Sequence, residues 1–523
     1  MSSSRPQNNN NPAADEVDPV ADHDLDELAE DDAAEILEDA QVDSDGDVAM
    51  DSDDDDQQET EEIHLQNDSI AYFDSHKHSI FAIAQHPIHT HLIATGGSEG
   101  EDDDAPGKGY VFDTSIAVSH QPLLPASYAS DPASSSAREN TELKPLFAID
   151  GHTDSINALT FTLPKGDFLV TGGMDGLVKV YMVGVPKGGD SSQARLKFLA
   201  ESRETEEINW LIPCPSPEYP NTLALGASDG SVWVLTVDIK DRASPIRIVQ
   251  SYFLHTGPCT SGAWSPDGNL LATVSEDSSL HVFDVWGVAG AKGLVTENGQ
   301  TVVSLTSVDQ RFAVEGGLYS VAIAPSGTFL AVGGAQGAIR IVGLPRLGGQ
   351  SAPAAQIAGA GARRGAAAEV STQAGQILAA LNVQSDGIET LSFAPAPQNL
   401  LAAGSVDGSI AVFDTARSFA VRKHIREAHE GAVVKVDFVK NAPQPGMTGW
   451  LLTSCGVDGV VRRWDLRGAT ASQNVTGTGL VKEWRGHQGG GEEGGGIFGF
   501  VQGETGERVV TAGDDALALV FEA

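Results

Sequence analysis

A short unit recurs eight times along this 523-residue chain, and the repetition constrains its fold more than any other feature. Most copies hold an apolar strand, a small-residue strand that ends in a Gly/Ser/Asp-rich turn, and a strand that closes on an aromatic-Asp pair. A clear copy reads Leu-Thr-Ser454-Cys-Gly-Val-Asp458-Gly and then Arg-Trp464-Asp465. One such unit cannot bury its own apolar face, so it must stack on its neighbours, and the number of copies decides whether a ring closes.

The eight copies are located by the turn that precedes the third strand. These turns are Gly96-Gly97-Ser98, Met174-Asp175-Gly176, Ser228-Asp229-Gly230, Glu276-Asp277-Ser278, Ala335-Gln336-Gly337, Val406-Asp407-Gly408, Val457-Asp458-Gly459 and Gly513-Asp514-Asp515. The pattern resembles the WD-repeat family, whose members are β-propellers, and the resemblance covers nearly everything after residue 62. It implies an all-β, eight-bladed propeller over residues 63–523, with loop insertions at about 98–108, 115–142, 346–376 and 488–496.

The resemblance also assigns a structural role to four residues of the seventh copy. In WD repeats, a loop His, a Ser or Thr of the second strand, the turn Asp and the Trp of the third strand form a hydrogen-bonded chain. Here these residues are His429, Ser454, Asp458 and Trp464. Other copies keep a histidine at the loop position: His76, His152, His255 and His487. The third copy has Glu206-Glu207 in that region, and the fifth has Gln336 in place of the Asp, so these two blades match the pattern least.

The two ends of the repeat region predict how the ring closes. The chain ends on a third strand, 517–521, with no fourth strand after it, whereas residues 69–73 have an outer-strand pattern before the first complete copy. We expect this N-terminal strand to complete the last blade, because pairing the two ends leaves no open ring edge to aggregate.

The negative charge of the chain is distributed unevenly. The sequence has 73 acidic and 32 basic residues, for a net charge of −41. Residues 1–62 hold 24 of the acidic residues against one basic residue, Arg5, so that segment carries −23 and the remainder carries −18. This composition predicts a disordered acidic tail ahead of an acidic propeller. Nucleic acid is a poor direct partner for such a surface, whereas a strongly basic protein is a good one.

Other features argue against chemistry at the site and against a membrane location. Three scattered cysteines, Cys214, Cys259 and Cys455, show no metal-ligand spacing and suit a reducing compartment. The polar N-terminus does not resemble a secretory signal, and no apolar run reaches the length of a membrane span. No nucleophile and base pair is evident. We therefore expect a monomeric protein that is not an enzyme, has no cofactor or metal, and is cytoplasmic, with a nuclear location left open.

Two copies carry acidic insertions in the loops that surround the upper mouth of the channel in propellers of this family, here called the top face. The first copy inserts Ser98–Gly107 and the eighth inserts Gln488–Gly496, and ring closure would make these blades neighbours. A single exposed carboxylate is ordinarily a solubilising charge, but several around one concave mouth focus a negative potential that attracts basic peptides, and aromatic rings add contacts. The predicted binding residues are Glu99, Asp102, Asp103, Asp104, Asp154, Glu207, Glu276, Glu389, Glu430, Glu492, Glu493, Phe81, Tyr319 and Phe498.

One stretch narrows the resemblance within the WD-repeat family. Residues 65–87, the acidic N-terminal segment and the count of eight blades resemble a family of fungal ribosome-assembly chaperones, to which the angio-associated migratory cell protein of animals is related. This resemblance implies a dedicated chaperone that captures the large-subunit ribosomal protein L10 (uL16) by its basic N-terminal segment. It also implies delivery of that protein to the pre-ribosomal large subunit.

Two other functions fit the same sequence. A signalling or cytoskeletal scaffold would use the side or bottom surfaces and apolar patches, so its binding would depend less on salt. A substrate receptor of a ubiquitin ligase is less favoured, because no additional folded interaction domain flanks the ring. Affinity capture with a salt titration distinguishes these alternatives from a chaperone of a basic protein.

Overall fold

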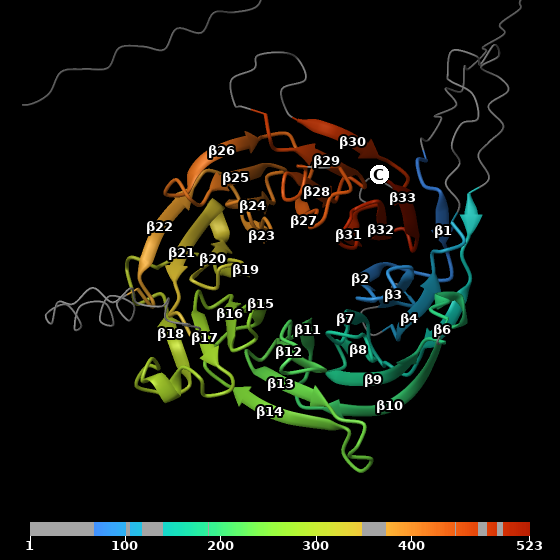
Figure 1. The fold of residues 1–523 in the computed structure, drawn as a ribbon, viewed down its shortest axis with the longest axis horizontal. Helices are drawn as coiled ribbons and strands as arrows, with labels where there is room; N and C mark the ends of the chain where they lie inside the picture. Colours follow the sequence, from blue (N-terminus) through green and yellow to red (C-terminus); the bar gives the residue numbers. More distant parts are fainter. Residues whose placement is uncertain are drawn as a thin grey trace, which may run out of the picture. The chain divides into compact units, whose positions relative to one another are not determined.

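The computed structural model describes residues 67–100, 105–117, 140–186, 188–347, 373–444, 446–468, 479–488 and 495–523. Eight antiparallel sheets surround a central opening within this part of the chain (Figure 1). The expectation of an all-β, eight-bladed propeller is therefore confirmed. The acidic segment 1–62 lies outside the described residues.

Each blade runs from an inner strand at the channel to an outer strand at the rim (Figure 1). The inner strands are β2 (Ile80–Gln85), β7 (Ile156–Phe161), β11 (Ile208–Pro213), β15 (Cys259–Trp264), β19 (Leu318–Ile323), β23 (Ile388–Phe393), β27 (Val433–Phe438) and β31 (Ile497–Val501). The second strands are β3 (Leu92–Ser98), β8 (Phe168–Gly173), β12 (Thr222–Ala227), β16 (Leu270–Ser275), β20 (Phe329–Gly334), β24 (Leu400–Ser405), β28 (Leu451–Gly456) and β32 (Arg508–Gly513).

The third strands are β4 (Gly107–Asp113), β9 (Leu177–Gly184), β13 (Val232–Val237), β17 (Leu280–Asp284), β21 (Ala338–Gly343), β25 (Ile410–Asp414), β29 (Val461–Asp465) and β33 (Ala518–Glu522). The outer strands of blades one to seven are β6 (Pro145–Ile149), β10 (Arg195–Arg203), β14 (Ile246–Tyr252), β18 (Thr301–Leu305), β22 (Ile377–Asn382), β26 (Ala420–Ile425) and β30 (Leu480–Trp484). Three short 3-10 turns, Ser191–Gln193, Gly290–Lys292 and Ala335–Gly337, lie in connections.

The ring closes through the N-terminal strand, as expected. Strand β1 (Ala71–Phe73) pairs antiparallel with β33 and supplies the outer strand of the eighth blade. A further strand, β5 (Thr141–Glu142), lies beside β1 in the same sheet, pairs with it in parallel and covers its free edge. The sequence did not predict this strand. Two chain segments remote from the C-terminus therefore complete the last blade.

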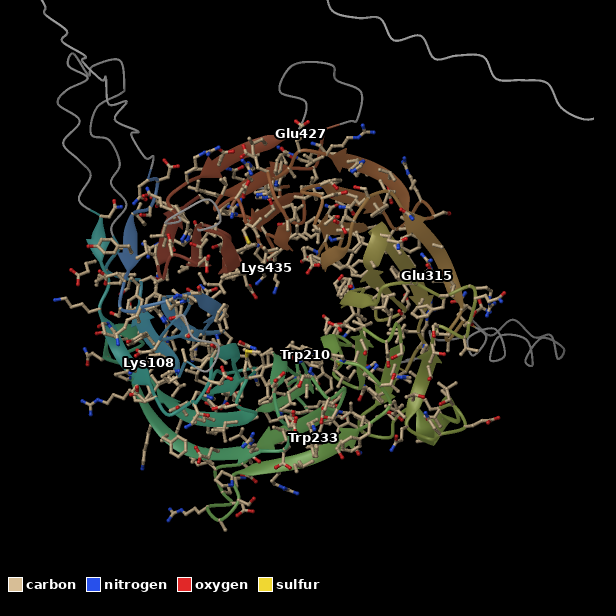
Figure 2. The ribbon with its side chains drawn as sticks, turned by 180° about the vertical axis from the view of Figure 1, so that it is seen from behind. Lys108, Trp210, Trp233, Glu315, Glu427 and Lys435 are labelled. Carbon is tan, nitrogen blue, oxygen red and sulfur yellow. The ribbon has the colours of Figure 1, made fainter. Side chains whose placement is uncertain are left out.

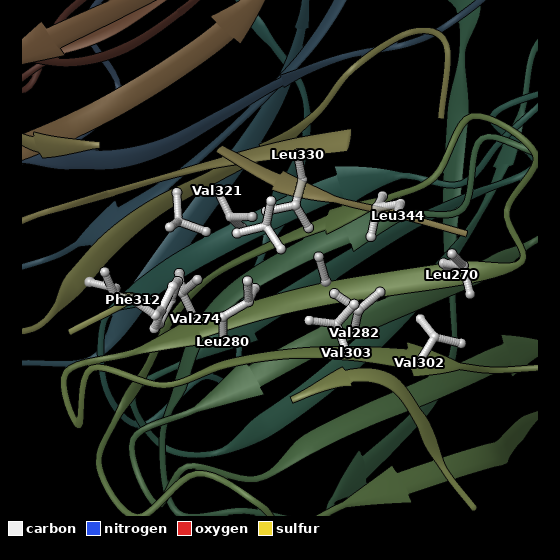
Figure 3. Packing of buried hydrophobic residues seen from close by; sticks show 14 of the residues in the cluster. Leu270, Val274, Leu280, Val282, Val302, Val303, Phe312, Val321, Leu330 and Leu344 are labelled. Carbon is white, nitrogen blue, oxygen red and sulfur yellow. The ribbon is translucent and has the colours of Figure 1, made fainter. Parts of the chain in front are cut away.

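Alternating small and branched residues build a core between successive blades. Second strands consist almost entirely of buried residues; only the first residues of β20 and β32, Phe329 and Arg508, are partly exposed. Figure 3 shows one such layer, in which Leu270 and Val282 of the fourth blade pack with Val321 and Leu330 of the fifth. Burying one side chain of this size contributes about 1.5–3 kcal/mol, so contacts between blades dominate the stability of the ring.

Turn glycines let adjacent blades approach. Gly176 and Gly408 have φ values of 72° and 77°, a region that other residues rarely adopt. A Cβ on Gly408 would lie 2.4 Å from the carbonyl oxygen of His429, which belongs to the loop leading into the next blade. A side chain at this turn would push the two blades apart, which explains the recurrent Asp-Gly pair.

Two boundaries and one turn residue differ from the sequence-based expectation. Strand β4 already begins at Gly107, and β5 begins at Thr141, so the first two insertions are shorter than expected. In the eighth blade the turn carboxylate that contacts the loop His is Asp515, not Asp514. The carboxylate of Asp514 instead accepts a hydrogen bond of 2.5 Å from Ser79 of the first blade.

Candidate functional site

A β-bulge interrupts the inner strand of every blade at its second residue. The ladder between inner and second strands skips one residue at this position in all eight sheets. A bulge turns the extra side chain away from the regular alternation of the strand. The eight bulge residues, here called the bulge ring, are Phe81, Asn157, Asn209, Thr260, Tyr319, Glu389, Val434 and Phe498.

The bulge ring contains four of the residues predicted to bind a partner: Phe81, Tyr319, Glu389 and Phe498. Two other members make contacts to the next blade. The Asn209 amide donates to the Cys259 carbonyl at 3.0 Å, and the Thr260 hydroxyl donates to the Leu318 carbonyl at 2.7 Å. Their side chains are engaged in the ring itself, so the remaining members carry the surface chemistry of the channel mouth.

The loop leading into each inner strand lies beside the turn between the second and third strands. Backbone N–H groups of Met174 and Ser228 in the turns donate to the carbonyls of Ser155 and Glu207 in these loops, at 2.9 and 3.3 Å. Equivalent bonds recur in the other blades, for example from Glu276. The top face is therefore formed jointly by the two types of connection that the sequence pointed to.

Carboxylates gather at the mouth on blades four to six. Partial burial raises the pKa of the Tyr319 phenol, and the nearby charges of Glu276, Glu389 and Asp386 raise it further. Partial removal of the Glu389 carboxyl from water raises its pKa, and the negative charge of Asp386 raises it further. The sequence analysis did not include Asp386, although it stands three residues before Glu389 in an exposed loop.

The other predicted carboxylates differ in their exposure to solvent and in their ion pairing. Glu430 is exposed, and Asp154 and Glu207 are half-buried. Glu99 forms an ion pair of 3.1 Å with Lys77, so part of its charge is compensated. Asp102, Asp103, Asp104, Glu492 and Glu493 lie outside the described residues.

Apolar side chains occupy the mouth where the ring closes. The rings of Phe81 and Phe498, from the first and eighth blades, have centroids 5.6 Å apart. Val434 of the seventh blade packs against the core of the eighth. Figure 2 shows Lys435 at the edge of the central opening, where its ammonium donates to the Phe500 carbonyl at 2.9 Å.

The four residues assigned to the seventh blade are joined by hydrogen bonds. His429 Nε2 lies 2.7 Å from Ser454 Oγ, and His429 Nδ1 lies 2.9 Å from Asp458. The Trp464 indole donates to the same serine hydroxyl at 2.9 Å. Arg462 adds a contact of 2.7 Å from its guanidinium to Asp458. The chain of bonds ties the loop on the top face to the second and third strands of the blade.

Other blades use the same position with different partners. His152 and His487 repeat the contacts to a second-strand Thr and a turn Asp. In the sixth blade Gln384 takes the place of the histidine and donates to Ser409 at 3.0 Å. In the third blade the corresponding residue is Thr205, which donates to the Glu207 carbonyl. Histidine or an amide at this position therefore binds the second strand or the turn, whereas the Thr205 hydroxyl binds within its own loop.

His76 of the first blade makes only half of this network. Its Nε2 lies 2.8 Å from the Thr95 hydroxyl, while Nδ1 has no hydrogen-bond partner. Burial lowers the pKa of His76 from 6.5 to about 3. Between these values the unfolded chain binds a proton that the folded protein does not. The contribution of His76 to the free energy of unfolding is therefore fully present above pH 6.5. It is lost as the pH falls, by about 1.4 kcal/mol per pH unit.

The substitution His76→Gln tests this pH dependence, because Gln384 shows that an amide fits the position. We expect the unfolding free energy of the variant to fall less steeply between pH 6.5 and 5 than that of the unaltered protein. Denaturant unfolding at several pH values measures the slope. Equal slopes for the two proteins would show that His76 is not buried in its neutral form.

Within the described ranges, no group of three His, Cys, Asp or Glu residues is arranged to hold a metal ion. The described part of the chain also contains no helix that is long and apolar enough to cross a membrane. The chemistry that the top face offers is therefore charge, aromatic rings and aliphatic surface around one opening.

The eight four-stranded blades and their hydrogen-bonded His, Ser/Thr, Asp and Trp residues define a WD-repeat propeller. The family described as "WD domain, G-beta repeat" matches residues 143–181 and 246–284. Two crystal structures of Sqt1 from Chaetomium thermophilum are 63% and 62% identical over 88% of this chain, and the alignments cover 98% and 100% of the solved chains. Their TM-scores are 0.75 and 0.74, and the second is bound to the N-terminus of the ribosomal protein L10. The chain belongs to the Sqt1 family of WD-repeat proteins.

More distant relatives agree with this assignment. Ribosome assembly protein SQT1 of Saccharomyces cerevisiae is 30% identical over 224 residues, which is 42% of this chain and 42% of that protein. The chain thus spans less than half the length of this curated relative. Angio-associated migratory cell protein of Homo sapiens is 25% identical over 458 residues, 87% of this chain and 80% of the relative.

Proposed function

We propose that this protein is a dedicated chaperone of the ribosomal protein L10, which holds the basic N-terminal segment of that protein on its acidic top face. The observation that carries the proposal is the 62% identical Sqt1 structure bound to the N-terminus of L10. The alignment with that structure covers 88% of this chain and 100% of the solved chain, so the surface that faces the peptide there has a counterpart here.

The electrostatics of the mouth support a basic client. Glu276, Asp386 and Glu389 lie around Tyr319, and Glu207 stands two blades away on the same face. Carboxylates around a concave opening add their potentials and raise the local concentration of a cationic segment. The Tyr319 ring can then contact a guanidinium through its face, a contact worth about 0.5–2 kcal/mol.

Competition for charge accounts for delivery. A ribosomal protein that sits on RNA carries dense positive charge, which binds stray nucleic acid unless it is shielded. The top face neutralises that charge in the cytoplasm until ribosomal RNA of the pre-ribosomal large subunit offers a stronger, multivalent site. Weak and salt-sensitive contacts suit this role, because the client must be released.

Charge reversal on the top face tests the proposal. We expect the double variant Glu207→Lys, Glu389→Lys to bind an L10 N-terminal peptide at least about tenfold more weakly at low salt, because two attractive charges become repulsive. Titration of a fluorescent peptide measures the dissociation constant. Glu297→Lys with Glu218→Lys is the matched control, since both residues are exposed on the connections of the opposite face.

The proposal is wrong if the top-face double variant keeps an unchanged affinity while its thermal unfolding shows an intact fold. Capture of partners from cytosol adds a second measurement. A single basic ribosomal protein that is lost as salt rises supports the chaperone function, whereas a stable mixed complex without it supports a scaffold.

A further inference from the structure

The mouth of the channel is divided into two chemically different sectors. On blades four to six the bulge ring and the adjacent loops present Tyr319, Glu389 and Asp386. At the described positions of blades seven, eight and one, the bulge ring is wholly apolar. We name this second group, Phe81, Val434, Val457 and Phe498, the apolar sector.

Two members of the apolar sector are exposed, and the other two, Val434 and Phe498, are half-buried. Phe81 has 37% and Val457 has 46% of its surface exposed. The Phe81 and Phe498 rings are 5.6 Å apart, and Val434 packs on the core of the blade that carries Phe498. Contiguous apolar surface that stays open to water is costly for a folded protein and usually marks a contact site.

Glycines keep this surface uncovered. A Cβ on Gly431 would lie 2.4 Å from Val457 Cγ2, and one on Gly496 would lie 3.4 Å from the Val457 backbone. At Gly431 and Gly496, the loops leading into the seventh and eighth blades pass close to Val457 with no side chain of their own. The polar neighbour Asp514 is engaged by the Ser79 hydroxyl at 2.5 Å.

An exposed apolar side chain also lies beside the carboxylates on the sixth blade. A Cβ on Gly387 would lie 3.7 Å from both Val406 Cγ2 and Glu389 Oε1, and 3.8 Å from the Tyr319 ring. Val406 is 37% exposed and belongs to the blade next to the seventh, which carries Val434 and Val457. A peptide attracted by those carboxylates therefore lies within reach of apolar surface on the same mouth.

We infer that the apolar sector receives an aliphatic or aromatic side chain of the same basic client segment. This inference rests on the proposed function and specifies its partner: the segment must be amphipathic, not merely basic. The carboxylates alone would attract any cationic protein, and their contribution falls with salt. A buried apolar anchor adds affinity that salt does not weaken and separates this client from other basic chains.

Two sets of variants separate the sectors. Phe81→Ala with Val457→Ser removes apolar surface, and Glu207→Gln with Glu389→Gln removes charge. We expect the apolar variant to bind an L10 N-terminal peptide at least about tenfold more weakly at every salt concentration, with an unchanged salt dependence. The charge variant should lose affinity mainly at low salt. Both altered positions of the apolar variant are exposed, so thermal unfolding should match the unaltered protein.

A matching change in the peptide completes the test. Serine replacements of its apolar residues should weaken binding to the unaltered protein but have little further effect on the apolar variant. Unchanged affinity of the apolar variant, with normal binding by the unaltered protein, overturns the inference. The inference is also overturned if the unaltered protein self-associates in sedimentation and the apolar variant does not, while both bind the peptide equally well. The apolar sector would then be a contact between copies of this chain. Absence of peptide binding by the unaltered protein would instead overturn the proposed function, and the inference with it.

Discussion

A chain that starts at Ser75 is expected to lose the closed ring, whereas a chain that starts at Asn67 should keep it. The first truncation removes β1, which supplies the outer strand of the eighth blade through its pairing with β33. It also removes Phe73, which is fully buried and stacks on Phe112 with centroids 4.3 Å apart. The result should be an open blade with unpaired backbone groups along β33, and a protein that aggregates.

A single substitution provides a graded version of this result. Phe73→Ala should lower the free energy of unfolding by about 3–5 kcal/mol, because it leaves a cavity between the last and first blades. Denaturant unfolding of the full chain measures the difference. Lys77→Ala is a suitable control near the same strand, since its exposed ammonium forms a surface ion pair with Glu99. A chain starting at Ser75 that is soluble, monomeric and melts cooperatively at the unaltered temperature would refute closure by β1.

The fold was predictable because its main determinants are local. A Gly/Ser/Asp-rich turn after a run of small residues identifies each blade, and at Gly408 the turn has a φ of 77° beside the carbonyl of His429, where a Cβ would clash. Ring closure followed from counting strands at the two ends. The strand pattern of residues 69–73 could be recognised because its alternate residues, Ala71 and Phe73, face the core.

The details of the site depend on tertiary placement and were harder to predict. The bulge at each inner strand leaves no mark in composition, so only the aromatic members and Glu389 attracted attention, while Val434 did not. The sequence does not show which of Asp514 and Asp515 is the turn carboxylate of the eighth blade. The contact between His487 and Asp515 in the structure identifies it. Pairing of β5 with β1 joins two segments separated by about seventy residues, and a two-residue strand carries too little pattern to be recognised.

The fifth blade shows how one substitution alters a network. Gln336 stands at the turn position, so Arg340, four residues later, faces an amide at the place where Arg462 has Asp458. Among the described residues, Arg340 forms no ion pair with a carboxylate. Its Nε has no hydrogen-bond partner, and burial lowers the pKa of the guanidinium. The weak match of this blade to the repeat pattern therefore corresponds to a missing ion pair.

The complete version of that network leads to the second large effect, which we expect from Asp458→Ala. Asp458 accepts hydrogen bonds from His429 at 2.9 Å and from Arg462 at 2.7 Å, and also from the backbone N–H of Glu430. Removing it leaves the largely buried Arg462 guanidinium with the Glu483 carboxylate and the Ala428 carbonyl as partners. Because an incompletely compensated buried charge is costly, we expect a loss of about 3–5 kcal/mol in the free energy of unfolding.

The same variant should also change the response to acid. Burial alone would raise the pKa of Asp458, but the hydrogen bond from His429 and the charge of Arg462 bring it below its ordinary value of 3.8. This carboxylate therefore contributes stability above about pH 4 that is lost as the pH falls further. Asp458→Ala should lack that component of acid sensitivity. Asp465→Ala in the same blade is the control, because its partner Arg467 is half exposed and such pairs contribute about 0–1 kcal/mol. Equal losses for the two variants would mean that the network around His429 does not hold the blade.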